Sequence, residues 1–254
     1  MSTTAIELLQ ERQVRRRGDY VVRLAHCEQE VMECLRLRYQ VFSEEMGAQL
    51  STREPGVDRD RFDAHCKHLL VRNDVTGEVI ATTRLLTDSD AGQAGSFYSE
   101  TEFDLSPIKA LGGRILEVGR TCIHHDYRRG AALAMLWQGI AQVVALNQID
   151  FLIGCASVPL DDGDSYVVTV LDNLRREHMA PEPLRCTSYI PLPQRDAAVL
   201  PQAALPPLLK GYLRLGAQIC SEPFWDAAFN VADVLILVDR DRITERYERH
   251  FNRG

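Results

Sequence analysis

The spacing of apolar and polar positions along this chain predicts strands and helices in a mixed order. Short apolar runs bounded by turn residues predict strands, and apolar residues three and four positions apart predict helices. We expect strands at 20–25, 68–72, 78–87, 115–124, 150–158, 186–190 and 234–239. We expect helices at 28–46, 131–147, 164–178, 205–215 and 243–251.

This order of elements predicts an α/β fold in which helices cover a mixed sheet. The long helix between the strands at 115–124 and 150–158 is a crossover connection, which pairs neighbouring strands in parallel. The turn at 73–77 instead joins its two strands as an antiparallel hairpin. We therefore expect a mixed, mostly antiparallel sheet that splays between the two parallel strands.

The ends and the polar stretches of the chain predict its domain organisation. Residues 1–18 form a basic, amphipathic arm, which either frays or packs on the domain, or lies on an anionic membrane surface. Residues 19–254 are expected to form a single domain. The proline-rich stretch 191–207 is interpreted as an insertion within it, because strand and helix signals continue beyond it. The polar stretch 47–66 predicts a long loop, and such loops are commonly functional or disordered.

Composition and charge exclude several classes of protein. Hydrophobic residues make up 45% of the 254 positions and charged residues 26%, as in soluble globular proteins. No apolar run reaches the roughly 18 residues of a transmembrane helix. The first residues lack the apolar core of a secretory signal, so we expect a cytoplasmic protein. The net charge of −7 disfavours nucleic-acid binding, and the seven scattered cysteines favour reduced thiols.

Two charged residues, Glu117 and Arg120, interrupt the apolar strand expected at 115–124. A charge inside an apolar strand is costly unless it is paired or faces a cavity. Regular alternation would place the two side chains on opposite faces of the sheet. Gly119 between them allows a bulge that turns both toward one cavity. A buried or edge ion pair is the structural alternative.

A strand-to-helix turn follows that strand and carries Arg128, Arg129, Gly130, Ala131 and Ala132. A glycine and small residues at the start of a helix let backbone N–H groups approach a phosphate, and the helix dipole favours the anion. Arginine and glycine also occur in such turns for solubility and geometry. The turn alone therefore leaves both interpretations open.

Acidic residues gather around the predicted loop 47–66. They are Glu44, Glu45, Asp58, Asp60 and Asp63. Such a group is either a solvated loop or a pocket for a cationic amine. The neighbouring pair His124 and His125 does not predict a metal site, because adjacent strand residues point to opposite sides, and no metal is expected.

Taken together, these segments resemble the ornithine-acyl carrier protein N-acyltransferases. The matching segments, in order, are Arg38-Tyr39-x-Val41-Phe42, Phe62-Asp63-x-x-Cys66-x-His68-Leu69-Leu70-Val71, Thr83-Arg84-Leu85-Leu86, Tyr98-x-x-x-Glu102-Phe103-Asp104, Glu117-Val118-Gly119-Arg120-Thr121-Cys122, Leu136-Trp137-x-Gly139-Ile140 and Leu208-Leu209-x-Gly211-Tyr212-Leu213-Arg214-Leu215-Gly216-Ala217. The resemblance covers about residues 20–250. That family is often labelled haemolysin-like, resembles the GNAT N-acetyltransferase superfamily and looks related to acyl-homoserine-lactone synthases.

The resemblance implies a GNAT-like fold with a C-terminal extension. It also implies transfer of a (3-hydroxy) fatty acyl group from acyl carrier protein to the α-amine of L-ornithine, which yields lyso-ornithine lipid. The implied donor is the acyl-phosphopantetheine of the carrier protein, with no permanently bound cofactor. A peripheral contact with the cytoplasmic membrane face follows if the basic arm 1–18 lies on a membrane surface. The alternatives are another acceptor (glycine, glutamine, lysine, tyrosine or S-adenosylmethionine) or a membrane-active protein without enzymatic activity.

The resemblance assigns roles to individual residues. Glu117 would accept the ammonium proton through water, and Arg120 and Arg84 would hold the acceptor carboxylate or order the acidic loop. The acceptor-binding set is Arg38, Asp58, Asp63, Arg84 and Glu102, of which the three acids would recognise a cationic side chain. The turn at 128–132 replaces the usual Gln/Arg-x-x-Gly-x-Gly/Ala loop, and it suits a carrier protein whose arm presents a single phosphate.

Overall fold

The computed structural model describes residues 15–52 and 54–241, which fall into two compact units. Unit 1 comprises the chain up to residue 96 together with 118–149, and unit 2 comprises 97–117 and the chain from 150 onward. The single domain expected over 19–254 stays a prediction. Most of the predicted N-terminal arm and the predicted helix 243–251 lie outside the described residues.

Unit 1 is built on an antiparallel set of strands. They are β1 (Arg15–Arg17), β2 (Tyr20–Leu24), β3 (Lys67–Asn73) and β4 (Val79–Thr87), with the later part of β5 (Ile115–Ile123) beside β4. The pairs β1–β2, β2–β3 and β3–β4 are all antiparallel, so the end of the predicted arm forms an edge strand. In the β3–β4 hairpin, Gly77 has a φ of +76°, a conformation that favours glycine.

The helices of unit 1 differ from the sequence prediction in two places. They are α2 (Glu28–Tyr39), a π-helical turn (Gln40–Glu45), α3 (Asp88–Ala94), a 3-10 turn (His125–Tyr127) and α5 (Ala132–Leu146). The predicted helix 28–46 is therefore present, but it changes to π geometry after Tyr39. Such turns are frequent at functional sites. The sequence did not predict α3, which Thr87 caps by accepting a hydrogen bond from Asp90 N.

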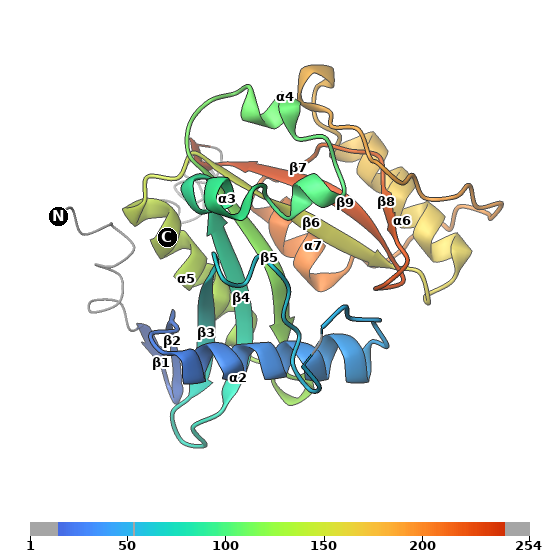
Figure 1. Ribbon diagram of the computed structural model, residues 1–254. Coiled ribbons are helices and arrows are strands. Elements are labelled where there is room, and N and C mark those ends of the chain that lie inside the picture. The colour runs from blue at the N-terminus through green and yellow to red at the C-terminus, as the bar shows by residue number, and fades with distance from the viewer. Residues whose placement is uncertain (1–14, 53, 242–254) are drawn as a thin grey trace, which may run out of the picture. The chain divides into compact units, whose positions relative to one another are not determined.

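Helix α5 packs closely on β2 and β3 because Gly139 has no side chain. A Cβ at this position would lie 2.8 Å from Leu69 Cδ2 and 2.9 Å from Val22 Cγ2. Figure 1 shows α2 and α5 beside the strands of this unit. The buried apolar residues of the strands therefore meet helices and form the core of unit 1.

Unit 2 is organised around the long antiparallel pair of β6 (Phe151–Pro159) and β9 (Val231–Asp239). Two short strands, β7 (Gln218–Ile219) and β8 (Phe224–Asp226), also pair with β9. The start of β5 pairs in parallel with β6, from Ile115 opposite Phe151 to Glu117 opposite Ile153. This confirms the predicted parallel neighbours. The helices are a 3-10 turn (Ser99–Thr101), α4 (Ser106–Lys109), α6 (Asp164–Glu177), a 3-10 turn (Glu182–Leu184) and α7 (Pro207–Arg214).

The strand predicted at 186–190 is wrong. Cys186 and Ser188 form only isolated bridges, to Ser221 and Phe103. Prolines stand on both sides of this segment, and proline lacks the N–H group that a strand ladder needs. Within the described ranges, no helix is both long enough and apolar enough to cross a membrane.

Candidate functional site

Arg38 is the centre of a buried network of charges in unit 1. Its side chain is fully buried, and its guanidinium donates from Nε to Asp58 Oδ2 (2.8 Å) and from Nη1 to Asp63 Oδ1 (2.6 Å). Both aspartates belong to the loop that precedes β3. The backbone N–H of Asp58 donates to Leu35 O of α2 (3.1 Å), so this loop is folded onto the helix that carries Arg38.

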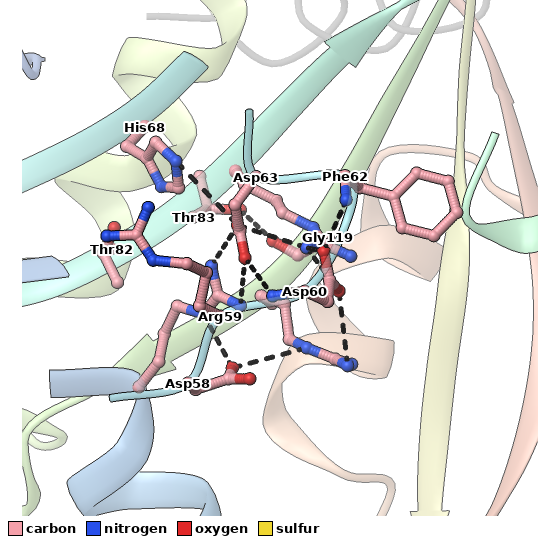
Figure 2. A network of polar contacts seen from close by, with 12 residues as sticks. Asp58, Arg59, Asp60, Phe62, Asp63, His68, Thr82, Thr83 and Gly119 are labelled. Carbon is pink, nitrogen blue, oxygen red and sulfur yellow. Dashed lines mark hydrogen bonds and ion pairs between the residues drawn. The ribbon is translucent and has the colours of Figure 1, made fainter. Parts of the chain in front are cut away.

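Two arginines of the sheet bind the same loop. Arg84 of β4 donates from Nη1 to both carboxylate oxygens of Asp60 at 2.7 Å, and to Asp63 Oδ1 at 3.2 Å. Arg120 of β5 forms longer ion pairs, from Nε to Asp58 Oδ2 (3.5 Å) and from Nη2 to Asp60 Oδ2 (3.8 Å). Figure 2 shows Asp58, Asp60 and Asp63 converging in this network. The predicted residues Arg38, Asp58, Asp63 and Arg84 thus meet in one place.

The charges of this network balance, since three arginines face three aspartates. Burial raises the pKa of Asp63, but the charges of Arg38 and Arg84 outweigh burial and leave the pKa below its usual range. Burial also lowers the pKa of the neighbouring His68 to about 4, so its ring is neutral at pH 7. That these aspartates recognise a cationic side chain stays a prediction.

Glu117 lies in unit 2, where β5 pairs with β6. Its side chain is buried, and its carboxylate accepts three hydrogen bonds from the segment before α4. Tyr98 N donates to Oε2 at 2.7 Å, while Ser99 N (2.7 Å) and Ser99 Oγ (2.5 Å) donate to Oε1. A buried carboxylate needs such donors, and these fix its position.

The pleat of β5 is interrupted at Arg120. Its φ of +50° lies in the left-handed region, which is uncommon for a residue with a side chain, and the irregularity falls on Arg120 rather than on Gly119. The two predicted catalytic residues contact different segments: Glu117 binds the Tyr98–Ser99 turn, and Arg120 faces the acidic loop. That both side chains face one cavity stays a prediction.

Glu102 lies beside two acids that the sequence did not single out. They are Asp226 of β8 and Asp233 of β9, and one carboxylate oxygen from each of the three residues lies within 4.8 Å of the others. Glu102 and Asp233 are buried, and Asp226 is half-buried. Burial, together with the charge of Asp233, raises the pKa of Glu102 to about 8. We call these three residues the acid cluster of unit 2.

Comparison with known proteins gives the family. An acetyltransferase (GNAT) domain model matches residues 37–138. The L-ornithine N(alpha)-acyltransferase of Rhodobacter capsulatus is 37% identical over 92% of this chain and 95% of that protein, and the enzyme of the same name from Rhizobium meliloti is 35% identical over 90% and 83%. The chain belongs to the L-ornithine N(alpha)-acyltransferase family. It is an N-acyltransferase, as the sequence predicted.

Solved structures place this acyltransferase in the expected fold class. The structure of FeeM, an N-acyl amino acid synthase from uncultured soil microbes, aligns with a TM-score of 0.53 at 13% sequence identity. The alignment covers 92% of this chain and 94% of the FeeM chain. The acyl-homoserine-lactone synthase LasI covers 87% and 89% with a TM-score of 0.51 at 14% identity. These similarities confirm the mixed α/β, GNAT-like fold.

The acyltransferase presents its predicted donor-binding turn at the start of α5. Arg128, Arg129 and Gly130 are exposed, Ala131 is half-buried and Ala132 is buried. Ala131, at the N-cap of this helix, has no polar side-chain group that could cap it, and backbone N–H groups at the start of a helix suit an anion. Arg128 also forms an ion pair with Glu45. Binding of the donor phosphate at this turn stays a prediction.

Sequence reasoning missed Asp226, Asp233 and the backbone donors to Glu117. Asp233 carried a usable signal, because it is a charged residue inside an otherwise apolar strand, as Glu117 is. Asp226 carried none, since it ends a strand of three residues. The donors at Tyr98 and Ser99 are backbone groups, which no residue type reveals.

Proposed function

We propose that this acyltransferase moves a fatty acyl group from the phosphopantetheine thioester of acyl carrier protein to the α-amine of L-ornithine, giving a lyso-ornithine lipid. The observation that carries the proposal is the alignment of nearly the whole chain with enzymes named L-ornithine N(alpha)-acyltransferase, at 33% to 37% identity. The aligned length includes both units, so the residues of unit 2 are compared along with the GNAT segment.

The proposed chemistry needs little covalent help from the protein. The amine nitrogen attacks the thioester carbonyl carbon, the C–S bond breaks, an amide forms and the thiol leaves with a proton. The α-ammonium must first lose a proton, and a positioned carboxylate provides general-base catalysis of this kind. We assign this role to Glu117, acting through water, because three donors hold its carboxylate in place.

The arginine network suggests different roles for its members. Arg38 and Arg84 make close hydrogen bonds with the aspartates and order the acidic loop. Arg120 makes longer ion pairs and its side chain is 15% exposed, so we assign it to the acceptor carboxylate.

The donor is assigned to the start of α5. An acidic carrier protein needs a local basic surface on this acidic chain, and exposed arginines are present at Arg16, Arg17, Arg128 and Arg129. The phosphate of the prosthetic arm would bind the backbone N–H groups after Gly130. Because the product is a lipid, we also assign the enzyme a peripheral contact with the cytoplasmic membrane face.

An acceptor panel tests the proposed function. The purified protein is incubated with 3-hydroxyacyl carrier protein and, separately, with ornithine, lysine, glutamine, glycine, tyrosine and S-adenosylmethionine, and products are identified by mass. Acyl-ornithine should form fastest. Faster acylation of another acceptor would overturn the assignment of ornithine, and dye release from liposomes without any acylated product would favour a membrane-active protein.

A further inference from the structure

The acid cluster of unit 2 brings together three segments that are distant in sequence. Glu102 follows the 3-10 turn 99–101, Asp226 ends β8, and Asp233 lies in β9, which pairs with β8 in an antiparallel register. Glu102 is 3% exposed and Asp233 is 4% exposed, so two of the three carboxylates are withdrawn from solvent. Buried carboxylates this close together repel one another unless a proton or a cation lies between them.

The Glu102 carboxylate interacts with Cys155 and Tyr98, but one of its oxygens is open to a further donor. Its Oε2 atom is buried and has no hydrogen-bond partner among the described residues. Leaving a buried acceptor unsatisfied is unfavourable, so an additional donor is expected there. Ser157 Oγ donates to Asp233 at 2.6 Å, and the N–H groups of Ala228 and Phe229 donate to Asp226 at 2.9 and 3.1 Å.

We propose that Glu102, Asp226 and Asp233 bind a primary ammonium group, and that in the enzyme they hold the side-chain ammonium of the acceptor amino acid. The inference rests on the proposed function for the identity of that acceptor. An ammonium group has three donors, which matches three carboxylates. Oxygens hydrogen-bonded at about 2.8 Å to one tetrahedral nitrogen lie about 4.6 Å apart, within the 4.8 Å limit of the cluster.

The position of the cluster relative to Glu117 supports this assignment. Ser99 Oγ donates to Glu117 Oε1 and lies 3.4 Å from Cys155 Sγ, and Cys155 in turn interacts with Glu102. Ser99 and Cys155 therefore connect the proposed base with the acid cluster. The two nitrogens of an extended α,δ-diamino acid are separated by about 6 Å from ordinary bond lengths. Such an acceptor would place its α-amine near Glu117 and its other nitrogen in the cluster.

Kinetics with a matched pair of acceptors test the inference. Norvaline has the carbon skeleton of ornithine but lacks the side-chain nitrogen. The expected effect of Glu102→Gln or Asp233→Asn is a KM for ornithine raised about 10- to 100-fold with kcat little changed, and an unchanged KM for norvaline. Glu177→Gln, which alters an exposed carboxylate at the end of α6, is the control and should change neither constant. An unchanged KM for ornithine in both cluster variants would overturn the inference while leaving the proposed function in place.

A binding measurement separates this inference from the proposed function. Calorimetric titration with 1,4-diaminobutane should show binding to the wild type and at least tenfold weaker binding to Glu102→Gln, even if ornithine proves not to be the acceptor. If the wild type does not bind 1,4-diaminobutane, the inference is wrong. Binding of Mg²⁺ or Ca²⁺ that depends on Glu102 when the diamine has no effect would also overturn it, since the cluster would then be a metal site. Should Glu102→Gln fail to fold by circular dichroism, Asp226→Asn, at a half-buried position, takes its place.

Discussion

Unit 1 and unit 2 both bury carboxylates, but they satisfy them in different ways. In unit 1, three arginines face three aspartates in a network whose formal charges cancel; the arginines are Arg38, Arg84 and Arg120, and the aspartates are Asp58, Asp60 and Asp63. In unit 2, Glu102 keeps one buried oxygen without a hydrogen-bond partner among the described residues and lies close to two further acids. Buried charge thus has two uses here: a balanced network positions a loop, whereas a cluster of acids with an unsatisfied carboxylate oxygen is suited to a cationic ligand.

Removing the central arginine should break the balanced network and have the largest effect on stability. Arg38→Met leaves Asp58 and Asp63 buried without their main partner, and breaking a buried ion pair typically costs about 3–5 kcal/mol. Urea unfolding should show this loss. Arg36→Met, on an exposed position of the same helix, is the control and should stay within about 0.5 kcal/mol of the wild type. Equal stability of the two variants would show that the network contributes nothing to the fold.

Neutralising Glu102 should raise the free energy of unfolding at high pH, whereas Arg38→Met should lower it. Its pKa of about 8 in the folded protein is above the usual value for glutamate, so the folded state holds this proton more tightly than the unfolded state. Its contribution to stability is complete below about pH 4.5 and is lost as the pH rises through 8.

Glu102→Gln should therefore be more stable than the wild type at pH 9, on the order of a few kcal/mol, with the difference shrinking toward pH 4.5. Urea unfolding at these two pH values, without added amine, measures it. Wild-type stability that does not fall between pH 5 and pH 9 would mean that Glu102 is charged and compensated in the folded protein.

The smallest effect on stability is expected for exposed charges that belong neither to the arginine network of unit 1 nor to the acid cluster of unit 2. Replacing Arg128 and Arg129 together by glutamate should leave stability within about 0.5 kcal/mol, because surface charges contribute little. The KM for acyl carrier protein should rise about threefold to tenfold, and more at low salt, because steering of an acidic partner is screened by ions. An unchanged KM at low salt would remove these residues from the docking surface.

The sequence predicted the balanced network better than the acid cluster, for a physical reason. Arg38, Asp63 and Arg84 stand in local segments that resemble the family in order and spacing, so their importance could be read from the chain. Asp58 and Asp60 were singled out as part of the acidic group around the predicted loop. Glu102 was predicted from the same resemblance, but its partners come from a three-residue strand and from β9. Glu102 lies more than 100 positions from both partners in the chain, and periodicity does not reveal such a tertiary contact.

The secondary structure also divides into parts that the sequence predicts and parts that it does not. Long periodic elements such as α5, β6 and α6 were predicted within one or two residues of their ends. The π-helical turn after Tyr39 and the left-handed Arg120 were not, because both are local departures that tertiary contacts impose on regular segments.

Glu117 is the residue to which we assign the proton of the acceptor amine. Single-turnover transfer from 3-hydroxyacyl carrier protein to ornithine tests this assignment, with wild type, Glu117→Gln and the control Glu177→Gln compared at one pH. We predict that Glu117→Gln keeps the fold by circular dichroism and slows transfer roughly 10²-fold or more, as expected for loss of a general base, while the control keeps the native rate. A native rate in Glu117→Gln would show that Glu117 is not the base and that its carboxylate is a structural anchor for the Tyr98–Ser99 turn.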